Sequence, residues 1–278
     1  MPMLRHLFIL ILVLIPLFFS CGGKRVYNYE SAEAMYEEAL RELNKKGGFP
    51  WILTGTNYDK VFKLLKDIQL RYTYSSYAVL AELRTADAYF KKGEYEQAAI
   101  EYERFVKNHP GHSEIPYAIY RLAVSYYKQR RSYDRDPTYT REALKWFEVF
   151  VERYPDSPLI SEARERIKRC RSELAKREIY IGKFYEKRGN HRAAINRFRV
   201  VVDNYGDTKS LEEALFLLGK VYYEENQFDL AKEALDRVVR EFPHAKYHDK
   251  AAKLLAEIEK KEGRGYREKG DKKALVEW

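Results

Sequence analysis

The sequence predicts an all-α protein in which pairs of amphipathic helices repeat along the chain. Aromatic residues, 24 Tyr and 14 Phe, recur at helical spacing with charged residues between them. Proline is scarce, with 9 residues in 278, so that few positions interrupt a helix. A pattern of small, aromatic and helix-ending residues also returns four times along the chain.

The repeated pattern begins at four small residues, Ala86, Ala123, Gly182 and Gly219. In three of the four copies, a Tyr lies three positions after the small residue, and an Ala lies nine positions after that Tyr. A large aromatic or aliphatic residue follows four positions after the Ala, and another follows three positions after that. These are the offsets of the tetratricopeptide motif, in which small residues let paired helices approach closely. The sequence therefore predicts a tetratricopeptide-repeat superhelix of about five helix pairs, with a long helix joining its N- and C-terminal halves.

The first twenty residues have the pattern of an export signal. Arg5 precedes an apolar run from Leu7 to Phe19, which is too short to span a bilayer as a helix. The following segment, Leu-Phe-Phe-Ser-Cys at 17–21, resembles a bacterial lipobox, in which the cysteine is acylated and becomes the mature N-terminus. We therefore predict a lipoprotein signal peptide at 1–20. The alternative is an ordinary signal peptide followed by an unmodified cysteine.

A lipid on Cys21 would attach the protein to a membrane, with residues 21–30 as a lipidated linker. The next residue, Gly22, is not the Asp that retains well-studied lipoproteins in the inner membrane. We therefore predict an outer-membrane location, lipid-anchored and facing the periplasm. Cys170 is then the remaining thiol, so an intrachain disulfide is excluded, and its place in a predicted helix indicates a small buried residue.

Residues 31–157 are predicted to hold repeats 1–3. The first pair consists of helices from Ser31 to Leu43 and from Asn57 to Arg71, each with apolar residues on one side. A turn at 92–94 separates the helices of the second pair. The third pair carries eight extra residues between its helices, including the segment 131–137, and these predict a longer loop.

Residues 158–262 are predicted to hold repeats 4–5 and a capping helix. Ser157 as N-cap and Pro158 at the first helical position start a helix that runs without a breaker to Gly189. Turns are expected at 188–190 and 225–227, and a capping helix from His248 to Lys261. Residues 263–278 form a charged tail.

The formal net charge of +9 would permit nucleic-acid binding. Acidic and basic residues alternate along the predicted helices, however, which is typical of solvated helix faces. The export signal further separates the protein from nucleic acid, so we predict no nucleic-acid partner.

Several short segments carry a closer family likeness. They are Asp-Arg-Asp-Pro at 134–137, Leu-Ala-Lys-Arg-Glu at 174–178, Phe-Tyr-Glu-Lys-Arg-Gly at 184–189, Asn-Arg at 196–197 and Tyr-Gly-Asp-Thr at 205–208. Together they resemble the BamD family, the lipoprotein subunit of the outer-membrane β-barrel assembly machine. The resemblance implies a non-enzymatic factor that docks on the periplasmic domains of the barrel-forming BamA subunit. It also implies binding of unfolded outer-membrane β-barrel proteins, recognised by their C-terminal strands.

In this repeat class the first helix of each pair lines the concave face, so lining residues follow from the repeat offsets. In repeats two and three these residues are mostly apolar or aromatic, which suits an extended peptide rich in aromatic side chains. The predicted substrate-peptide groove comprises Leu80, Leu83, Asp87, Phe90, Tyr117, Tyr120, Val124 and Tyr127. The alternative is that these aromatics pack between helices, which is the commoner use of aromatic residues at helical spacing.

In repeats four and five the corresponding region is charged, which suits a polar docking surface for a folded partner. The predicted docking residues are Lys176, Lys183, Lys187, Arg188, Arg197, Glu213, Lys220 and Glu224.

Motifs for catalysis are missing from the sequence, which lacks a phosphate-binding loop, a nucleophile elbow and the dinucleotide-binding glycine pattern. The pairs His109/His112 and His244/His248 lack a third metal ligand. We predict no metal, no cofactor and no enzymatic activity. The alternative function is a general tetratricopeptide lipoprotein scaffold for another envelope complex, in pilus assembly or cell division.

Overall fold

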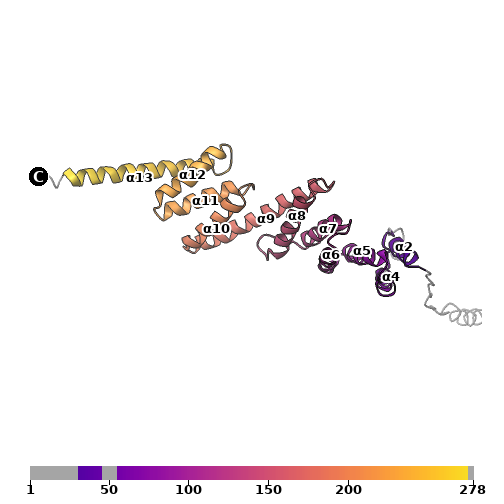
Figure 1. The fold of residues 1–278 in the computed structure, drawn as a ribbon. Helices are drawn as coiled ribbons and strands as arrows, with labels where there is room; N and C mark the ends of the chain where they lie inside the picture. The colour runs from indigo at the N-terminus through magenta and orange to yellow at the C-terminus, as the bar shows by residue number, and fades with distance from the viewer. Residues whose placement is uncertain (1–30, 46–54, 275–278) are drawn as a thin grey trace, which may run out of the picture. The chain divides into compact units, whose positions relative to one another are not determined.

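The structure, a computed structural model, describes residues 31–45 and 55–274, with side chains as far as Gly263 (Figure 1). These residues form eleven α-helices joined by irregular segments, without a strand. The predicted signal peptide 1–20, Cys21 and the linker 21–30 lie outside this part of the chain. The chain divides into two units, residues 1–78 and 79–278.

The first unit contains the predicted first helix pair, α2 (Ala32–Leu43) and α4 (Tyr58–Arg71), which pack on each other. The side-chain oxygens of Ser31 and Asn57 accept the backbone N–H groups of Ala34 (3.1 Å) and Lys60 (3.0 Å). Both helices therefore begin with side-chain caps at the predicted positions. The buried faces of the pair include Met35, Ala39, Leu43, Val61, Leu65 and Ile68.

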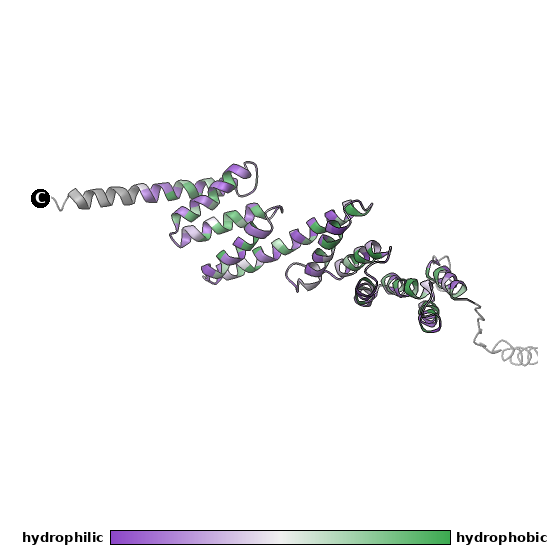
Figure 2. Cartoon of the chain, viewed as in Figure 1, coloured by the Kyte–Doolittle hydropathy of each residue, from purple (hydrophilic) through white to green (hydrophobic). Residues whose placement is uncertain are grey.

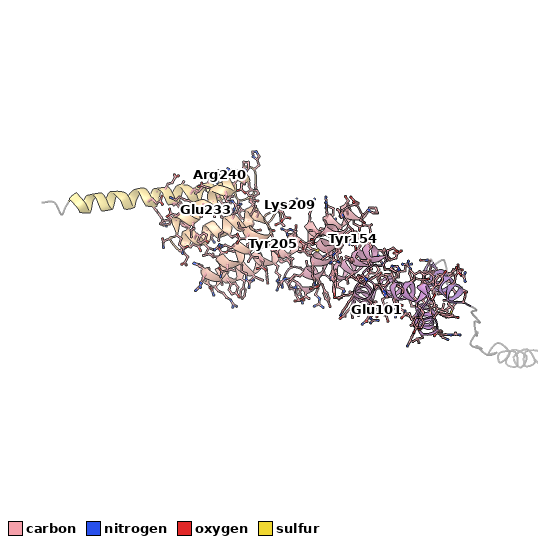
Figure 3. All side chains as sticks on the ribbon, in the orientation of Figure 1. Glu101, Tyr154, Tyr205, Lys209, Glu233 and Arg240 are labelled. Atoms are coloured by element: carbon pink, nitrogen blue, oxygen red, sulfur yellow. The ribbon has the colours of Figure 1, made fainter. Side chains whose placement is uncertain are left out.

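Helix α5 (Ser76–Lys92) leads into the second unit, where each helix from α6 onward packs on the next in the chain. The helices are α6 (Tyr95–Asn108), α7 (Ile115–Lys128), α8 (Thr138–Arg153), α9 (Ile160–Lys187), α10 (His191–Asn204), α11 (Leu211–Glu224), α12 (Phe228–Glu241) and α13 (His248–Ala274). Hydrophobic and hydrophilic residues alternate along them (Figure 2). Charged side chains such as Glu233 and Arg240 on α12 are exposed (Figure 3). The predicted all-α tetratricopeptide fold class is confirmed.

Three turns within the helix pairs share one geometry. Gly93, Gly189 and Asn226 have positive φ angles of 87°, 70° and 58°. The residue after each donates its N–H to the carbonyl oxygen five positions earlier, at 2.9–3.0 Å. This is the Schellman arrangement, in which a left-handed residue after the helix satisfies its last carbonyl groups. The predicted turns at 92–94, 188–190 and 225–227 are therefore confirmed.

Helix α9 joins two hydrophobic cores. Its Ala163 and Cys170 are buried in the core formed with α5 to α8, and its Ala175 and Ile179 in the core formed with α10 to α13. The helix has 28 residues, which corresponds to about 42 Å at 1.5 Å per residue. The predicted long helix is thus confirmed, whereas the predicted division of the repeats at residue 157 stays a prediction.

Two predicted helix ends are wrong. Helix α9 begins at Ile160 with Leu159 as its N-cap. Ser157 caps the preceding turn instead, where its Oγ accepts the N–H of Leu159 at 3.3 Å. Helix α13 continues to Ala274 instead of ending near Lys261. This extension contains three glycines, Gly263, Gly265 and Gly270, each of which costs a helix about 1 kcal/mol relative to alanine.

Among the described helices, none combines the length and the apolar character needed to cross a bilayer.

Two of the four small residues at the start of the motif, Gly182 and Gly219, are points of close helix approach, as predicted. A methyl group at Gly182 on α9 would collide with the ring of Phe198 on α10, which is fully buried. A methyl group at Gly219 on α11 would lie 2.6 Å from Cγ of Leu235 on α12. The absence of a side chain at these positions therefore sets the spacing of both helix pairs.

We expect Gly182→Val to destabilise the protein by about 2 kcal/mol or more, because the added carbons must displace the Phe198 ring from a packed core. The measurement is the free energy of unfolding from urea titration followed by circular dichroism. Gly263→Val is the matched control, since no atom lies within 4 Å of the added carbon. Equal destabilisation by both variants would contradict the close-packing explanation.

Candidate functional site

The centre of the predicted groove is a buried carboxylate that joins three helices. Asp87 on α5 is 5% exposed. Its Oδ1 accepts hydrogen bonds from the hydroxyls of Tyr102 on α6 (2.5 Å) and Tyr117 on α7 (2.7 Å). Its Oδ2 accepts one from Nη1 of Arg84 (2.6 Å). Because a buried charge is stable only when it is paired and hydrogen-bonded, these contacts fix the positions of all four side chains.

Arg121 connects this carboxylate network to the aromatic surface of the groove. Its Nε donates to the Tyr102 hydroxyl at 3.2 Å. Its guanidinium carbon lies 3.6 Å from the centroid of the Phe90 ring, in cation–π geometry. The planar guanidinium therefore holds the half-buried Phe90 ring against the network.

Three cations lie close to the buried carboxylate. Arg84 pairs with Asp87, and Lys91 and Arg121 lie near enough to interact with its charge. Burial lowers the pKa of Lys91, and the charges of Arg121 and Arg84 lower it further, while Asp87 raises it.

The two tyrosines act as hydrogen-bond donors. Burial raises the pKa of Tyr102 and of Tyr117 well above the ordinary value, and the charge of Asp87 raises both further. Both hydroxyls therefore keep their protons at neutral pH and donate them to the carboxylate.

The predicted groove residues divide into two groups. Leu83, Asp87, Tyr120, Val124 and Tyr127 are buried, with exposed fractions of 8% or less. Leu80, Phe90 and Tyr117 remain partly exposed. The partly exposed residues are thus the ones a ligand can touch, and the assignment of all eight to a groove stays a prediction.

Two buried residues of this set pack against aromatic rings of α8. The Tyr120 ring lies 5.3 Å from that of Phe150, and the Tyr127 ring 6.0 Å from that of Phe147. They support the groove from within the core.

Sequence reasoning missed Arg84, Lys91, Tyr102 and Arg121. Tyr102 occupies a packing position of the repeat, and Arg84 and Arg121 lie outside the offsets used to select lining residues. Lys91 lies at the offset that gave Lys187 and Glu224 in repeats four and five, but it was not selected in repeat two. The signal that could have revealed them was Asp87 itself. A carboxylate among apolar positions of a first helix needs buried partners.

The predicted docking residues of repeats four and five are largely paired with charges of the same chain. Lys183 pairs with Glu213, Lys220 with Glu186 (2.7 Å) and Glu224 (3.5 Å), and Arg197 with Glu178 (3.0 Å). Lys176, Lys187 and Arg188 form no ion pair with a described residue. Arg188 instead lies over the Phe184 ring, 4.1 Å from its centroid.

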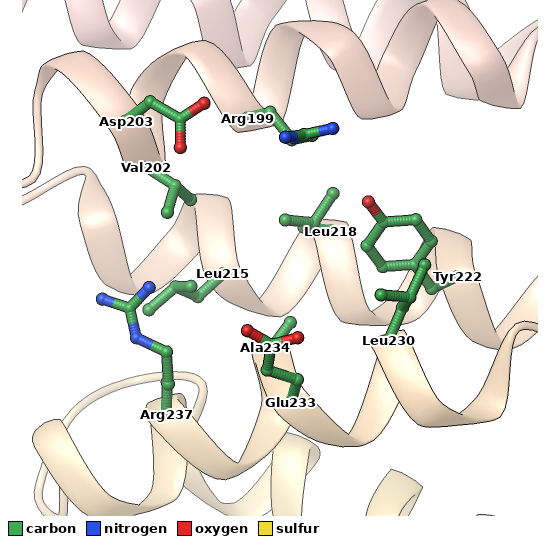
Figure 4. Close-up of a pocket in the computed structure, with 10 residues that line it drawn as sticks. All are labelled: Arg199, Val202, Asp203, Leu215, Leu218, Tyr222, Leu230, Glu233, Ala234 and Arg237. Carbon is green, nitrogen blue, oxygen red and sulfur yellow. The ribbon is translucent and has the colours of Figure 1, made fainter.

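A separate hollow of about 320 Å³ lies between α10, α11 and α12 (Figure 4). Leu215 and Leu218 of α11 lie between its two charged edges, which carry Arg199 and Asp203 on α10 and Glu233 and Arg237 on α12. None of the predicted site residues lines this hollow.

Among the described residues, no cluster of three His, Cys, Asp or Glu side chains could hold a metal ion. His109 Nε2 lies 2.9 Å from a carboxylate oxygen of Glu82, and His248 contacts Asp249. Burial raises the pKa of the Cys170 thiol to about 12, so the thiol is a poor nucleophile at neutral pH.

Comparison with known proteins gives a consistent family match. The YfiO family model, described as outer membrane lipoprotein, matches residues 29–233, and a tetratricopeptide-repeat model matches residues 216–264. The outer membrane protein assembly factor BamD of Neisseria gonorrhoeae is 30% identical over 227 residues, or 78% of this chain and 81% of the relative. The BamD protein of Caulobacter vibrioides is 29% identical over 236 residues, or 85% of this chain and 76% of the relative.

We expect Tyr102→Phe to lower the free energy of unfolding by about 1–3 kcal/mol, because Asp87 and Arg121 both lose a buried hydrogen-bond partner. Urea unfolding of the purified protein measures the change. Tyr74→Phe is the matched control at a fully exposed tyrosine and should change stability by no more than about 0.5 kcal/mol. A Tyr102→Phe protein as stable as the control would show that the network adds nothing to the fold.

Proposed function

Since this chain belongs to the BamD family of outer membrane lipoproteins, we propose that it is a non-enzymatic subunit of a β-barrel assembly machine. In this role it binds unfolded outer-membrane proteins and docks on a barrel-forming, BamA-like subunit to promote their folding and insertion. The observation that supports the substrate-binding role best is the rigid aromatic and cationic surface around Asp87.

The groove suits an extended segment with aromatic side chains and a carboxylate. Phe90 and Tyr117 provide partly exposed rings that are already fixed by Arg121 and Asp87, so little side-chain entropy is lost on binding. The positive side chains near Asp87, among them Arg121, favour the approach of a negative group. The C-terminal strand of an outer-membrane β-barrel, which ends in a free carboxylate, has both features.

A binding role also agrees with the chemistry of the polar groups. The Asp87 carboxylate is occupied by three donors, so it is poorly placed to act as a general base. The Cys170 thiol is buried and remains protonated at neutral pH. These groups hold the structure together and leave recognition to the surface.

Docking on the BamA-like subunit would use the surface of repeats four and five. The ion pairs Lys183–Glu213 and Arg197–Glu178 keep side chains of both signs in fixed positions there. Lys176 and Lys187 are exposed and available to carboxylates of a partner. Residues of this kind contribute chiefly to orientation and association rate.

The lipid on Cys21 would hold the protein at the outer membrane, on the periplasmic face. Each buried methylene contributes about 0.8 kcal/mol, so more than one acyl chain gives stable attachment. Anchoring restricts the protein to the surface where its substrates are inserted.

We expect Phe90→Ser and Tyr117→Ser to weaken binding of a C-terminal β-barrel peptide about tenfold or more, because each removes an aromatic contact in the groove. Fluorescence anisotropy with a labelled peptide measures the dissociation constant. Leu230→Ser, which removes an apolar side chain that is 44% exposed on α12, is the matched control and should leave binding unchanged.

Peptide amidation provides a second test of the same site. Loss of the terminal negative charge should weaken binding to the wild-type chain, because the electrostatic attraction between the peptide and the cations near Asp87 is lost. If the free-acid and amidated peptides bind with equal affinity, the terminal carboxylate of the peptide does not contribute to binding. Unchanged binding by both Phe90→Ser and Tyr117→Ser would refute the groove.

We expect the wild-type chain, purified from detergent-solubilised envelopes, to bring down a large β-barrel protein with repeated periplasmic domains. Cys21→Ser should release the chain from the membrane fraction, because the acylated thiol is its anchor. Mass spectrometry identifies the partners, and fractionation followed by immunoblotting checks the location. Recovery of pilus or cell-division components without the barrel protein would favour the general scaffold instead.

A further inference from the structure

One face of α9 carries large aromatic side chains that remain accessible to solvent. Tyr180 is 50% exposed and Phe184 is 44% exposed. Arg177, Tyr180, Phe184 and Arg188 follow one another at helical spacings of three, four and four, so they lie along the same face. We call Tyr180, Phe184 and Arg188 the α9 ridge.

The protein itself covers the first part of this face with the loop between α7 and α8. Nη1 of Arg177 donates to the carbonyl oxygens of Tyr133, at 3.2 Å, and of Arg135. The Tyr133 ring meets the Tyr180 ring edge-on, with centroids 5.9 Å apart. The loop therefore shows how a polypeptide segment can bind to this helix face, with its carbonyls on an arginine and an aromatic ring on the ridge.

An acidic residue follows the aromatic residue of this loop. The pKa of Asp134, the residue after Tyr133, lies below its ordinary value because of a hydrogen bond from Ser132, and the nearby Arg177 lowers it further. The segment on the first part of the face thus combines an aromatic side chain with an adjacent acid.

The second part of the face repeats the same chemistry without a cover. Arg188 lies 4.1 Å from the centroid of the Phe184 ring, and its charge meets no carboxylate among the described residues. Lys187, next to it, is exposed. The ridge therefore offers an aromatic surface together with an arginine, the residue types that contribute most to protein–protein interfaces.

We propose that the α9 ridge binds an extended segment of a partner protein in which an aromatic side chain lies next to a carboxylate. The aromatic side chain packs on Tyr180 and Phe184, and the carboxylate pairs with Arg188. The surface deepens the proposed docking role and rests on it, because Arg188 is one of the predicted docking residues. It lies on a different helix from Phe90 and Tyr117, so peptide binding to the ridge can fail while peptide binding in the groove is retained. An anionic membrane surface is less favoured, because the covered part of the same face holds a polypeptide.

The test uses a fluorescein-labelled decapeptide of alternating Phe and Asp residues, and a matched peptide with Lys in place of every Asp. Fluorescence anisotropy measures the binding of each peptide to the full chain in detergent micelles. The chain carries Phe90→Ser in all samples, so that binding in the groove does not hide the effect. We expect the acidic peptide to bind more tightly, and the pair Tyr180→Ser and Phe184→Ser to weaken it about tenfold or more.

The charge of Arg188 is tested independently. Arg188→Glu keeps both rings, and it should reverse the preference, so that the lysine peptide binds more tightly than the acidic one. Leu230→Ser, at a similarly exposed apolar side chain on α12, should have no effect on either peptide. Circular dichroism checks that each variant keeps its helical content.

Two results would overturn the proposal. The first is that the acidic peptide binds with the same affinity before and after Tyr180→Ser and Phe184→Ser are added to the Phe90→Ser chain. The second is an unchanged preference after Arg188→Glu. Binding to phosphatidylglycerol vesicles is measured in parallel. If the acidic peptide fails to bind and vesicle binding is lost with Tyr180→Ser and Phe184→Ser, the ridge is a membrane-binding surface instead.

Discussion

The second unit depends on one uninterrupted helix that belongs to two cores. Between Ala163 and Ile179, α9 contains neither proline nor glycine, so its backbone hydrogen bonds continue from one core into the next. Gly182 then lets α10 approach closely, and Gly189 ends α9 in a left-handed turn that leads into α10. Because both cores pack on the same helix, displacement of one core has to bend α9 or move the other. The insertion loop and the α9 ridge keep their positions for the same reason.

The groove around Asp87 shows how a repeat fold accommodates a specific surface. Desolvating one carboxylate is costly, and two tyrosines and an arginine offset that cost by orienting every polar atom. The energetic result is rigidity in the buried layer and, above it, rings that are fixed before a ligand arrives. In repeats four and five the charges instead pair across neighbouring helices, as in Lys220–Glu186. The two halves therefore differ in how their polar groups are used.

Local rules predicted the helix pairs well, because capping and turn residues act over a few positions. Ser31, Asn57, Gly93 and Gly189 each determine a boundary by their own backbone or side chain. The site was harder to predict. The partners of Asp87 come from three helices, and a repeat offset does not tell whether a ring such as Tyr120 points to solvent or into the neighbouring pair. The exposed Phe184 was missed because its offset lies outside the predicted lining positions.

The position of Cys170 has a consequence for measuring the motion of this protein. The sequence contains two cysteines, and acylation of Cys21 would leave Cys170 as the remaining free thiol. That thiol is fully buried in the middle of α9, so a modifying reagent reaches it only when the surrounding core opens. The rate of thiol labelling therefore reports how often the helix separates from its neighbours. The wild-type chain carries its own probe of local opening, placed where its two cores meet.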